Sequence, residues 1–189
     1  SGHRMAYWKK HLVLFGGYHE TQHGAKYFND LWVFDLDAKK WIPCPGPAGL
    51  PAPEPRSGMQ IVVHGDTLYI FGGFCRQTKQ SQVQAAAARA RKGKKAAEDI
   101  EESGVFLNDV WSVNLAQLGI EQEKGDTAAP SASTAAPATT AASAKPAPEA
   151  VYGEAKWQRV KTGGKAPIPR TGMASVLFKN RVYLFGGVA

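Results

Sequence analysis

Residues 68–73 read Leu-Tyr-Ile-Phe-Gly-Gly, four apolar residues that run into a double glycine. The same pattern returns as Leu-Val-Leu-Phe-Gly-Gly at residues 12–17 and as Val-Tyr-Leu-Phe-Gly-Gly at residues 182–187. A Ser-Gly or Thr-Gly pair stands fifteen residues before the first glycine of each copy, and the three copies align from that pair without a gap. Such self-similarity indicates a repeat architecture in which each repeat is one supersecondary unit.

A second shared block follows two of these copies. Residues 29–36 read Asn-Asp-Leu-Trp-Val-Phe-Asp-Leu, and residues 108–115 read Asn-Asp-Val-Trp-Ser-Val-Asn-Leu. A single tryptophan comes later in each unit, at Trp41 and at Trp157, where it is predicted to open the outermost strand of the unit.

The series of Pro-Arg, Ser/Thr-Gly, an apolar strand ending in Gly-Gly, Asn-Asp with an apolar run, and a tryptophan resembles the kelch repeat. The resemblance implies an all-β fold in which each unit is one four-stranded blade of a β-propeller. Residues 1–5, 12–17 and 27–36 resemble in particular the kelch domain-containing protein four group, including its fungal relatives. In such a blade, Trp32 and Trp111 are expected to pack one blade against the next.

The repeat boundaries predict a propeller fragment with two four-stranded blades and the inner half of a third. The first blade and its Pro-rich link span residues 1–56, the second spans 57–170, and residues 171–189 supply two strands of another. Because a kelch unit needs about 50 residues and a ring about 4 to 8 blades, the chain is too short for closure. We therefore expect the missing blades of a longer chain, or a partner, to cover the open strand edges.

Two insertions interrupt the second blade. Residues 76–104 are rich in alanine and charge, and their core at 82–102 is predicted to be helical with a break at Gly93. Residues 116–155 are dominated by Ala, Pro, Ser and Thr, which predicts disorder. If the strands of a blade are named a to d from the axis outward, the b-c and d-a connections share one face. That face is predicted to carry the helical insertion and a loop at residues 18–28.

The double glycines and the Pro-Arg pairs are predicted to have structural roles. A strand that ends in Gly-Gly can turn with positive φ and lets another segment approach closely. Arg56 and Arg170 stand at a fixed distance from the glycines, which indicates that their side chains hydrogen-bond loop carbonyls near that turn. The predicted structural set is Gly16, Gly17, Gly72, Gly73, Gly186, Gly187, Arg56, Arg170, Trp41 and Trp157.

Two patterns suggest catalysis but fit it poorly. Residues 19–23 read His-Glu-Thr-Gln-His, the zinc-protease pattern, which needs a helix to bring both histidines to one metal ion. This segment is predicted to be a polar loop between strands. Some kelch propellers are copper oxidases, but no motif sets a Tyr and His pair beside Cys75. We therefore expect no enzyme, no metal and no cofactor.

Composition and charge limit the class of protein. The chain has 189 residues, 43% of them hydrophobic, and a formal net charge of +7. No apolar run reaches the roughly 18 residues of a membrane span, and no signal-peptide pattern is present. Its two cysteines, Cys44 and Cys75, have neither metal nor redox spacing. These features predict a soluble intracellular protein of the cytoplasm or nucleus, with no membrane partner.

The resemblance implies a non-catalytic protein-interaction scaffold, within a large complex, that binds other proteins through the b-c and d-a face. The alternative is a nucleic-acid-associated or ribonucleoprotein-assembly factor that contacts RNA phosphates through residues 76–104. This segment contains seven Lys/Arg and four Asp/Glu. The basic run also suits a nuclear localisation signal or a solvated helix face. A ubiquitin-ligase substrate adaptor is a third, minor alternative. The predicted contact residues are Tyr18, His19, His23, Phe74, Arg76, Arg89, Arg91, Lys94 and Lys95.

Overall fold

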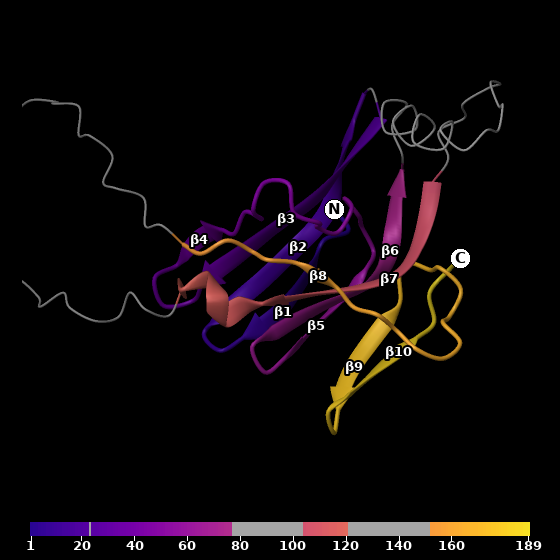
Figure 1. Ribbon diagram of the computed structural model, residues 1–189. Coiled ribbons are helices and arrows are strands. Elements are labelled where there is room, and N and C mark those ends of the chain that lie inside the picture. Colours follow the sequence, from indigo (N-terminus) through magenta and orange to yellow (C-terminus); the bar gives the residue numbers. More distant parts are fainter. Residues whose placement is uncertain (23, 77–103, 121–151) are drawn as a thin grey trace, which may run out of the picture.

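The computed structural model describes residues 1–22, 24–76, 104–120 and 152–189, and these residues form an all-β structure (Figure 1). The first antiparallel sheet has the order β1 (Arg4–Trp8), β2 (His11–Thr21), β3 (Gly24–Asp35), β4 (Lys40–Pro43). The second has the order β5 (Gln60–His64), β6 (Thr67–Arg76), β7 (Gly104–Asn114), β8 (Gln158–Arg159). A two-stranded hairpin contains β9 (Ala174–Phe178) and β10 (Arg181–Phe185). The predicted fold class is confirmed, while the predicted helix at 82–102 lies outside the described residues.

Two-residue turns join the first two strands of each unit. Lys9 (φ 51°), Gly65 (φ 59°) and Lys179 (φ 46°) occupy the first turn position, and all three have positive φ. Tight hairpin turns of this kind match the right-handed twist of the flanking strands. At Lys179 and Asn180 both turn positions have positive φ, whereas the turns that begin at Lys9 and Gly65 have it at the first position alone. Lysine is less suited to this conformation than glycine.

A β-bulge lies at each double glycine of the two complete sheets. The register of β2 against β3 shifts between Phe15 and Gly17, and that of β6 against β7 shifts between Phe71 and Gly73. Pairing then continues to the tip of the first hairpin, where Thr21 faces Gly24. The predicted loop at residues 18–28 is therefore wrong, because the bulge bends the strands without ending them.

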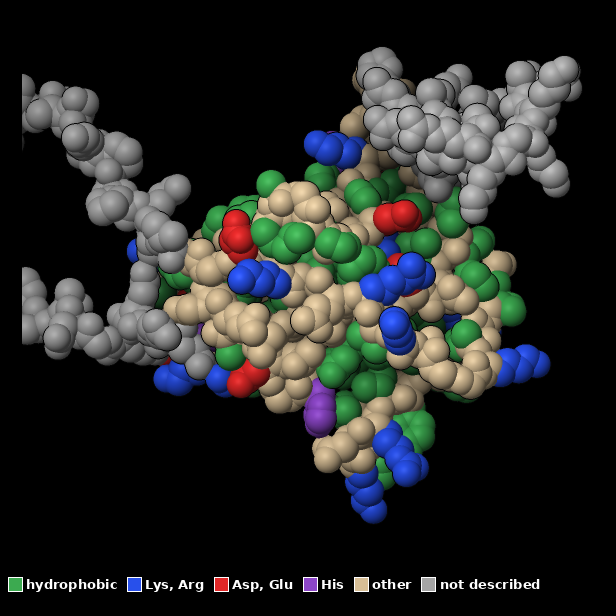
Figure 2. Space-filling view, viewed as in Figure 1, with side chains coloured by type: hydrophobic (Ala, Val, Ile, Leu, Met, Phe, Trp, Pro, Cys, Tyr) green, Lys and Arg blue, Asp and Glu red, His purple; other side chains and the backbone are tan. Residues whose placement is uncertain are grey.

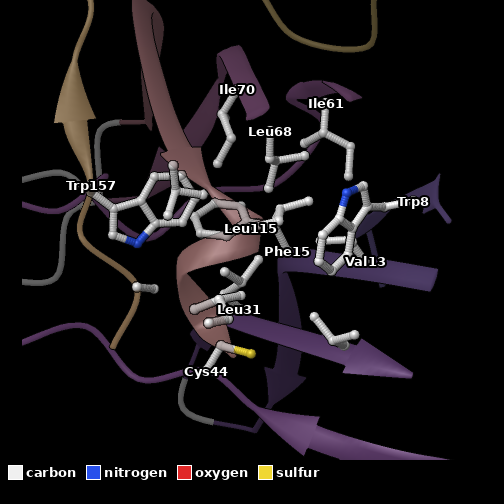
Figure 3. Close-up of a cluster of buried hydrophobic side chains, with 14 of the residues drawn as sticks. Trp8, Val13, Phe15, Leu31, Cys44, Ile61, Leu68, Ile70, Leu115 and Trp157 are labelled. Carbon is white, nitrogen blue, oxygen red and sulfur yellow. The ribbon is translucent and has the colours of Figure 1, made fainter. Parts of the chain in front are cut away.

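The hydrophobic core lies between the two four-stranded sheets (Figure 3). Alternate residues of a strand point to opposite faces of a sheet, so one face of the first sheet packs against the opposite face of the second. The buried side chains from the first sheet are Trp8, Val13, Phe15, Leu31, Val33 and Ile42, and those from the second are Ile61, Leu68, Ile70, Trp111 and Val113. One continuous core therefore joins the two sheets.

The described ends of the second insertion belong to this core. A 3-10 helix, η1 (Leu115–Leu118), buries both leucines, and Ile120 and Ala155 are buried beside it. The amide of Ala155 donates to the carbonyl of Pro45 at 2.8 Å. The predicted bounds of disorder, 116–155, are thus wrong at both ends, because apolar residues flank the Ala, Pro, Ser and Thr segment. The predicted disorder of the intervening segment falls outside the described residues.

Equivalent tryptophans differ in burial because, within the described residues, a neighbouring sheet covers one of each pair and not the other. Trp157 is 8% exposed, and its ring lies 5.3 Å from that of Phe15 across the core. Trp41 is 49% exposed, and its ring centroid lies 4.9 Å from that of Phe34 in the same sheet. In the same way Trp111 is buried between the sheets, as predicted, whereas Trp32 is half-buried on a face that no described sheet covers.

Candidate functional site

The long hairpins β2–β3 and β6–β7 extend beyond their bulges at the same edge of the molecule (Figure 1). Just past the bulges, Tyr18 faces Tyr27 across the first hairpin, and Phe74 faces Phe106 across the second. Cross-strand neighbours of this kind lie close enough for their side chains to pack. Each hairpin therefore presents an aromatic pair at the same height.

The two pairs form one continuous aromatic row, consisting of Tyr18, Tyr27, Phe74 and Phe106. The ring centroids of Tyr18 and Tyr27 are 5.6 Å apart in a stacked arrangement. Tyr27 meets Phe74 edge-on at 6.1 Å, and Phe74 meets Phe106 at 5.1 Å. All four side chains are half-buried, so the row crosses from the first sheet to the second while part of each ring stays exposed.

Burial raises the pKa of Tyr27 above its usual value of 10.0, although the charge of Arg76 acts in the opposite direction. Its hydroxyl is therefore protonated at neutral pH and is able to donate as well as accept a hydrogen bond. A ring that offers both an apolar face and a polar tip suits a contact surface for another protein.

Charges of both signs flank the aromatic row. The ammonium group of Lys26 lies 5.6 Å from the ring centroid of Phe28, and Glu20 and Arg76 are exposed near the hairpin ends. Figure 2 shows Lys and Arg side chains dispersed over the visible face, with acidic side chains between them. The described part of this edge is thus an aromatic surface with mixed charge rather than a uniformly basic one.

The structure brings together some of the predicted contact residues. Tyr18 and Phe74 belong to the aromatic row, His19 is exposed on β2, and Arg76 ends β6. The remaining predicted contacts lie outside the described residues: His23, Arg89, Arg91, Lys94 and Lys95. Sequence reasoning missed Tyr27 and Phe106, which could have been found as the aromatic residues that precede Asn-Asp in both units.

The first three residues of the His-Glu-Thr-Gln-His segment lie at the end of β2 rather than on a helix, and Gln22 is in the turn that follows. His19 belongs to β2, where residues alternate between the two faces, and His23 lies outside the described residues. No cluster of three His, Cys, Asp or Glu residues that could hold a metal ion occurs in the described ranges. Both cysteines are buried, and burial raises the pKa of Cys75 and raises that of Cys44 to about 12.

A family model described as the KLHDC2/KLHL20/DRC7 Kelch-repeats domain matches residues 1–145. The chain belongs to the kelch-repeat family. Human Host cell factor 2 is 24% identical over 203 residues, which cover 93% of this chain and 23% of that protein. Host cell factor of Drosophila melanogaster is also 24% identical, over 93% of this chain and 12% of that protein. The narrower resemblance to the kelch domain-containing protein four group stays a prediction.

The kelch fold is also shared with a solved structure. The structure of YjhT superposes with a TM-score of 0.52 at 17% sequence identity, over 98% of this chain and 44% of that one. The kelch chain therefore spans less than half of this neighbour and at most about a quarter of the two curated relatives. No helix in the described ranges is long and apolar enough to cross a membrane.

Proposed function

We propose that this kelch chain is a non-catalytic scaffold that binds other proteins through the edge formed by the hairpin ends of β2–β3 and β6–β7. The single observation that carries the proposal is the aromatic row, which joins two blades into one surface of partly exposed rings. Aromatic side chains are enriched at protein interfaces because they bring large contact area at a small cost in conformational entropy. Tyr18, His19, Phe74 and Arg76 are the proposed contacts among the described residues.

Site-specific photo-crosslinking in the full-length protein tests this proposal. A photoreactive phenylalanine analogue would replace Phe74 or Tyr18, and the matched control would carry it at Tyr7, a 64% exposed aromatic position on β1. Discrete covalent adducts with other proteins are expected from positions 74 and 18 and not from position 7. Equal adducts from all three positions, or none from the aromatic row, would contradict the proposed surface.

The nucleic-acid alternative rests on the charge of residues 76–104, which hold seven Lys/Arg and four Asp/Glu. If RNA phosphates are the partner, the affinity must fall steeply as salt rises, because counterions are released on binding. Reversing the charges of Arg89, Arg91, Lys94 and Lys95 would then abolish binding and leave the crosslinks of Phe74 unchanged. A ubiquitin-ligase adaptor would instead co-purify with ligase subunits.

We infer that the scaffold works in the cytoplasm or the nucleus. The inference is supported by the two cysteines of the chain, Cys44 and Cys75, which do not form a disulfide with each other and are both free thiols. Disulfides are rare in cytosolic and nuclear proteins, whose thiols are kept reduced. Imaging of the tagged full-length protein checks this, and a secretory-pathway distribution would contradict it.

A further inference from the structure

The link that joins β8 to β9 is an exposed, basic segment of irregular backbone (Figure 1). Residues 156–170 contain five Lys/Arg and no Asp or Glu, so positive charge is concentrated there. Residues 161–168 are all exposed and belong to no strand or helix. Apart from the chain neighbours, no atom lies within 4 Å of the Cβ position of Gly163 or Gly164, so the middle of the link borders open space.

Thr162 lies in this link and differs from the other described threonines. Thr21 and Thr171 each donate a hydrogen bond to a backbone carbonyl, at 2.6 and 3.1 Å. Thr67 is half-buried at the start of β6. Thr162 is exposed, lies outside the strands and makes no hydrogen bond to a described residue. Its hydroxyl is therefore accessible to an enzyme.

The equivalent link is also exposed in the first unit, where a complete second sheet packs beside it. That link joins β4 to β5 and ends at Arg56, as the later link ends at Arg170. Ala48 stands eight residues before Arg56, and Thr162 stands eight residues before Arg170. Ala48 is exposed although the next blade is present. The accessibility of Thr162 therefore does not depend on an incomplete neighbour.

Arg159 stands three residues before Thr162, at the end of β8. Its backbone is fixed by the pairing of β8 with β7, where it faces Trp111, and its side chain is exposed. Protein kinases select their substrates by the pattern of charge around the acceptor, and one broad class of Ser/Thr kinases selects arginine at this spacing. A guanidinium suits such recognition because it binds an enzyme carboxylate through two parallel hydrogen bonds.

We propose that Thr162 is a phosphorylation site for a basophilic Ser/Thr kinase that recognises Arg159. In this step Oγ1 of Thr162 bonds to the γ-phosphorus of ATP while the bond from that phosphorus to the β-phosphate oxygen breaks, which releases ADP. The hydroxyl proton passes to the catalytic aspartate of the kinase. The product places about −1.5 to −2 charges between Lys161 and Lys165 and so offsets the basic character of the link. This site is separate from the aromatic row and does not depend on the proposed function.

Phosphate transfer from ATP to the folded full-length protein tests this proposal, with a kinase that selects arginine three residues before the acceptor. Mass spectrometry locates the phosphate, and a peptide with the sequence of residues 156–166 gives the rate for a fully accessible acceptor. We expect modification of Thr162 at a rate within about tenfold of that of the peptide, because the link is exposed on the surface. Arg159→Gln is expected to slow the reaction by at least about tenfold, as for loss of one charge-assisted hydrogen-bonded contact.

Matched variants separate recognition of this site from general charge effects. Lys156→Gln removes one positive charge from the same exposed segment and is expected to leave the rate unchanged. Thr162→Ala is expected to remove the phosphate from the link, while Thr171, whose hydroxyl is hydrogen-bonded, stays unmodified in the folded protein. The proposal is overturned if the peptide is modified and the folded protein is not, if neither is modified, if phosphate is found only at other positions, or if Arg159→Gln and Lys156→Gln have equal effects.

Discussion

At the scale of single residues, Arg56 shows how a fully buried charge is tolerated in this blade. Its guanidinium bonds two carbonyls and both oxygens of Asp109, whose side chain is 14% exposed. A bidentate pair of this kind combines charge with fixed geometry, but removal of one partner leaves the other buried and uncompensated. The interaction therefore sets where the third strand lies relative to the bulge.

Replacing Arg56 by Met is expected to lower the free energy of unfolding by about 3–5 kcal/mol, because the carboxylate of Asp109 loses its partner. Arg170→Met is the matched control, since the equivalent guanidinium is half-exposed and bonds no described carboxylate; its loss is expected to stay below about 1 kcal/mol. Urea titration followed by tryptophan fluorescence measures both. Equal effects of the two substitutions would show that the buried pair adds nothing.

Acid is expected to weaken the fold through Asp109. Burial alone would raise its pKa, but the hydrogen bonds and charge of Arg56, with the bond from Trp111, outweigh burial and hold the pKa below its usual 3.8. The stabilisation is thus complete above the unfolded pKa of about 4 and is lost as the pH falls through the lower folded value.

The corresponding measurement is the free energy of unfolding between pH 7 and pH 2 for the wild type and for Asp109→Asn. The difference between the two proteins is expected to shrink as the pH falls below about 4, because the wild-type carboxylate becomes protonated. Asp30→Asn, at the equivalent position without a described arginine partner, is the control and should keep the wild-type profile. A pH-independent difference for Asp109→Asn would contradict this.

At the scale of single elements, substitutions of the bulge glycines can distinguish the cost of a left-handed backbone conformation from the cost of a steric clash with a neighbouring strand. Gly72 and Gly186 have φ of 56° and 71°, so alanine at either position carries the left-handed penalty of about 1–2 kcal/mol. Only at Gly72 would the new Cβ also meet backbone oxygens, at 2.9 Å from Leu107 and 3.0 Å from Arg170. Gly72→Ala is therefore expected to lower the thermal unfolding temperature more than Gly186→Ala does. Equal decreases for the two variants would contradict the explanation by close approach.

The strands and their order could be predicted from the sequence because each unit repeats the same apolar runs and glycine pairs. What could not be predicted also depends on local backbone geometry. The bulge at Gly16 and Gly17 looked like a strand end, since Gly-Gly usually interrupts pairing, yet β2 continues to Thr21. The partner rings Tyr27 and Phe106 were missed for the same reason, because only the continued register brings them opposite Tyr18 and Phe74.

At the scale of the whole molecule, one core joins the two complete sheets while the C-terminal hairpin contributes little to it. Trp157 follows the second insertion yet packs on Phe15 of the first sheet, and Leu115 and Leu118 of η1 complete the same cluster. The sequence alone did not predict this difference in burial, since Trp41 and Trp157 occupy equivalent positions. The burial of each tryptophan depends on whether a neighbouring sheet packs against it, which the repeat pattern in the sequence does not indicate.

Amide hydrogen exchange is expected to distinguish the two complete sheets from the C-terminal hairpin. The amides of β2, β3, β6 and β7 should exchange together by global unfolding, because their side chains share one core. Those of β9 and β10 should exchange at least about 100-fold faster, since most of their apolar side chains are exposed, including Phe185 at 83%. The ties from Gly172 to Gly58 and from Thr171 to Gly58, at 2.8 and 3.1 Å, hold the base of the hairpin and should protect residue 172 more than residues 181–185. Exchange of the hairpin at the rate of the core would mean that the whole chain unfolds as one unit.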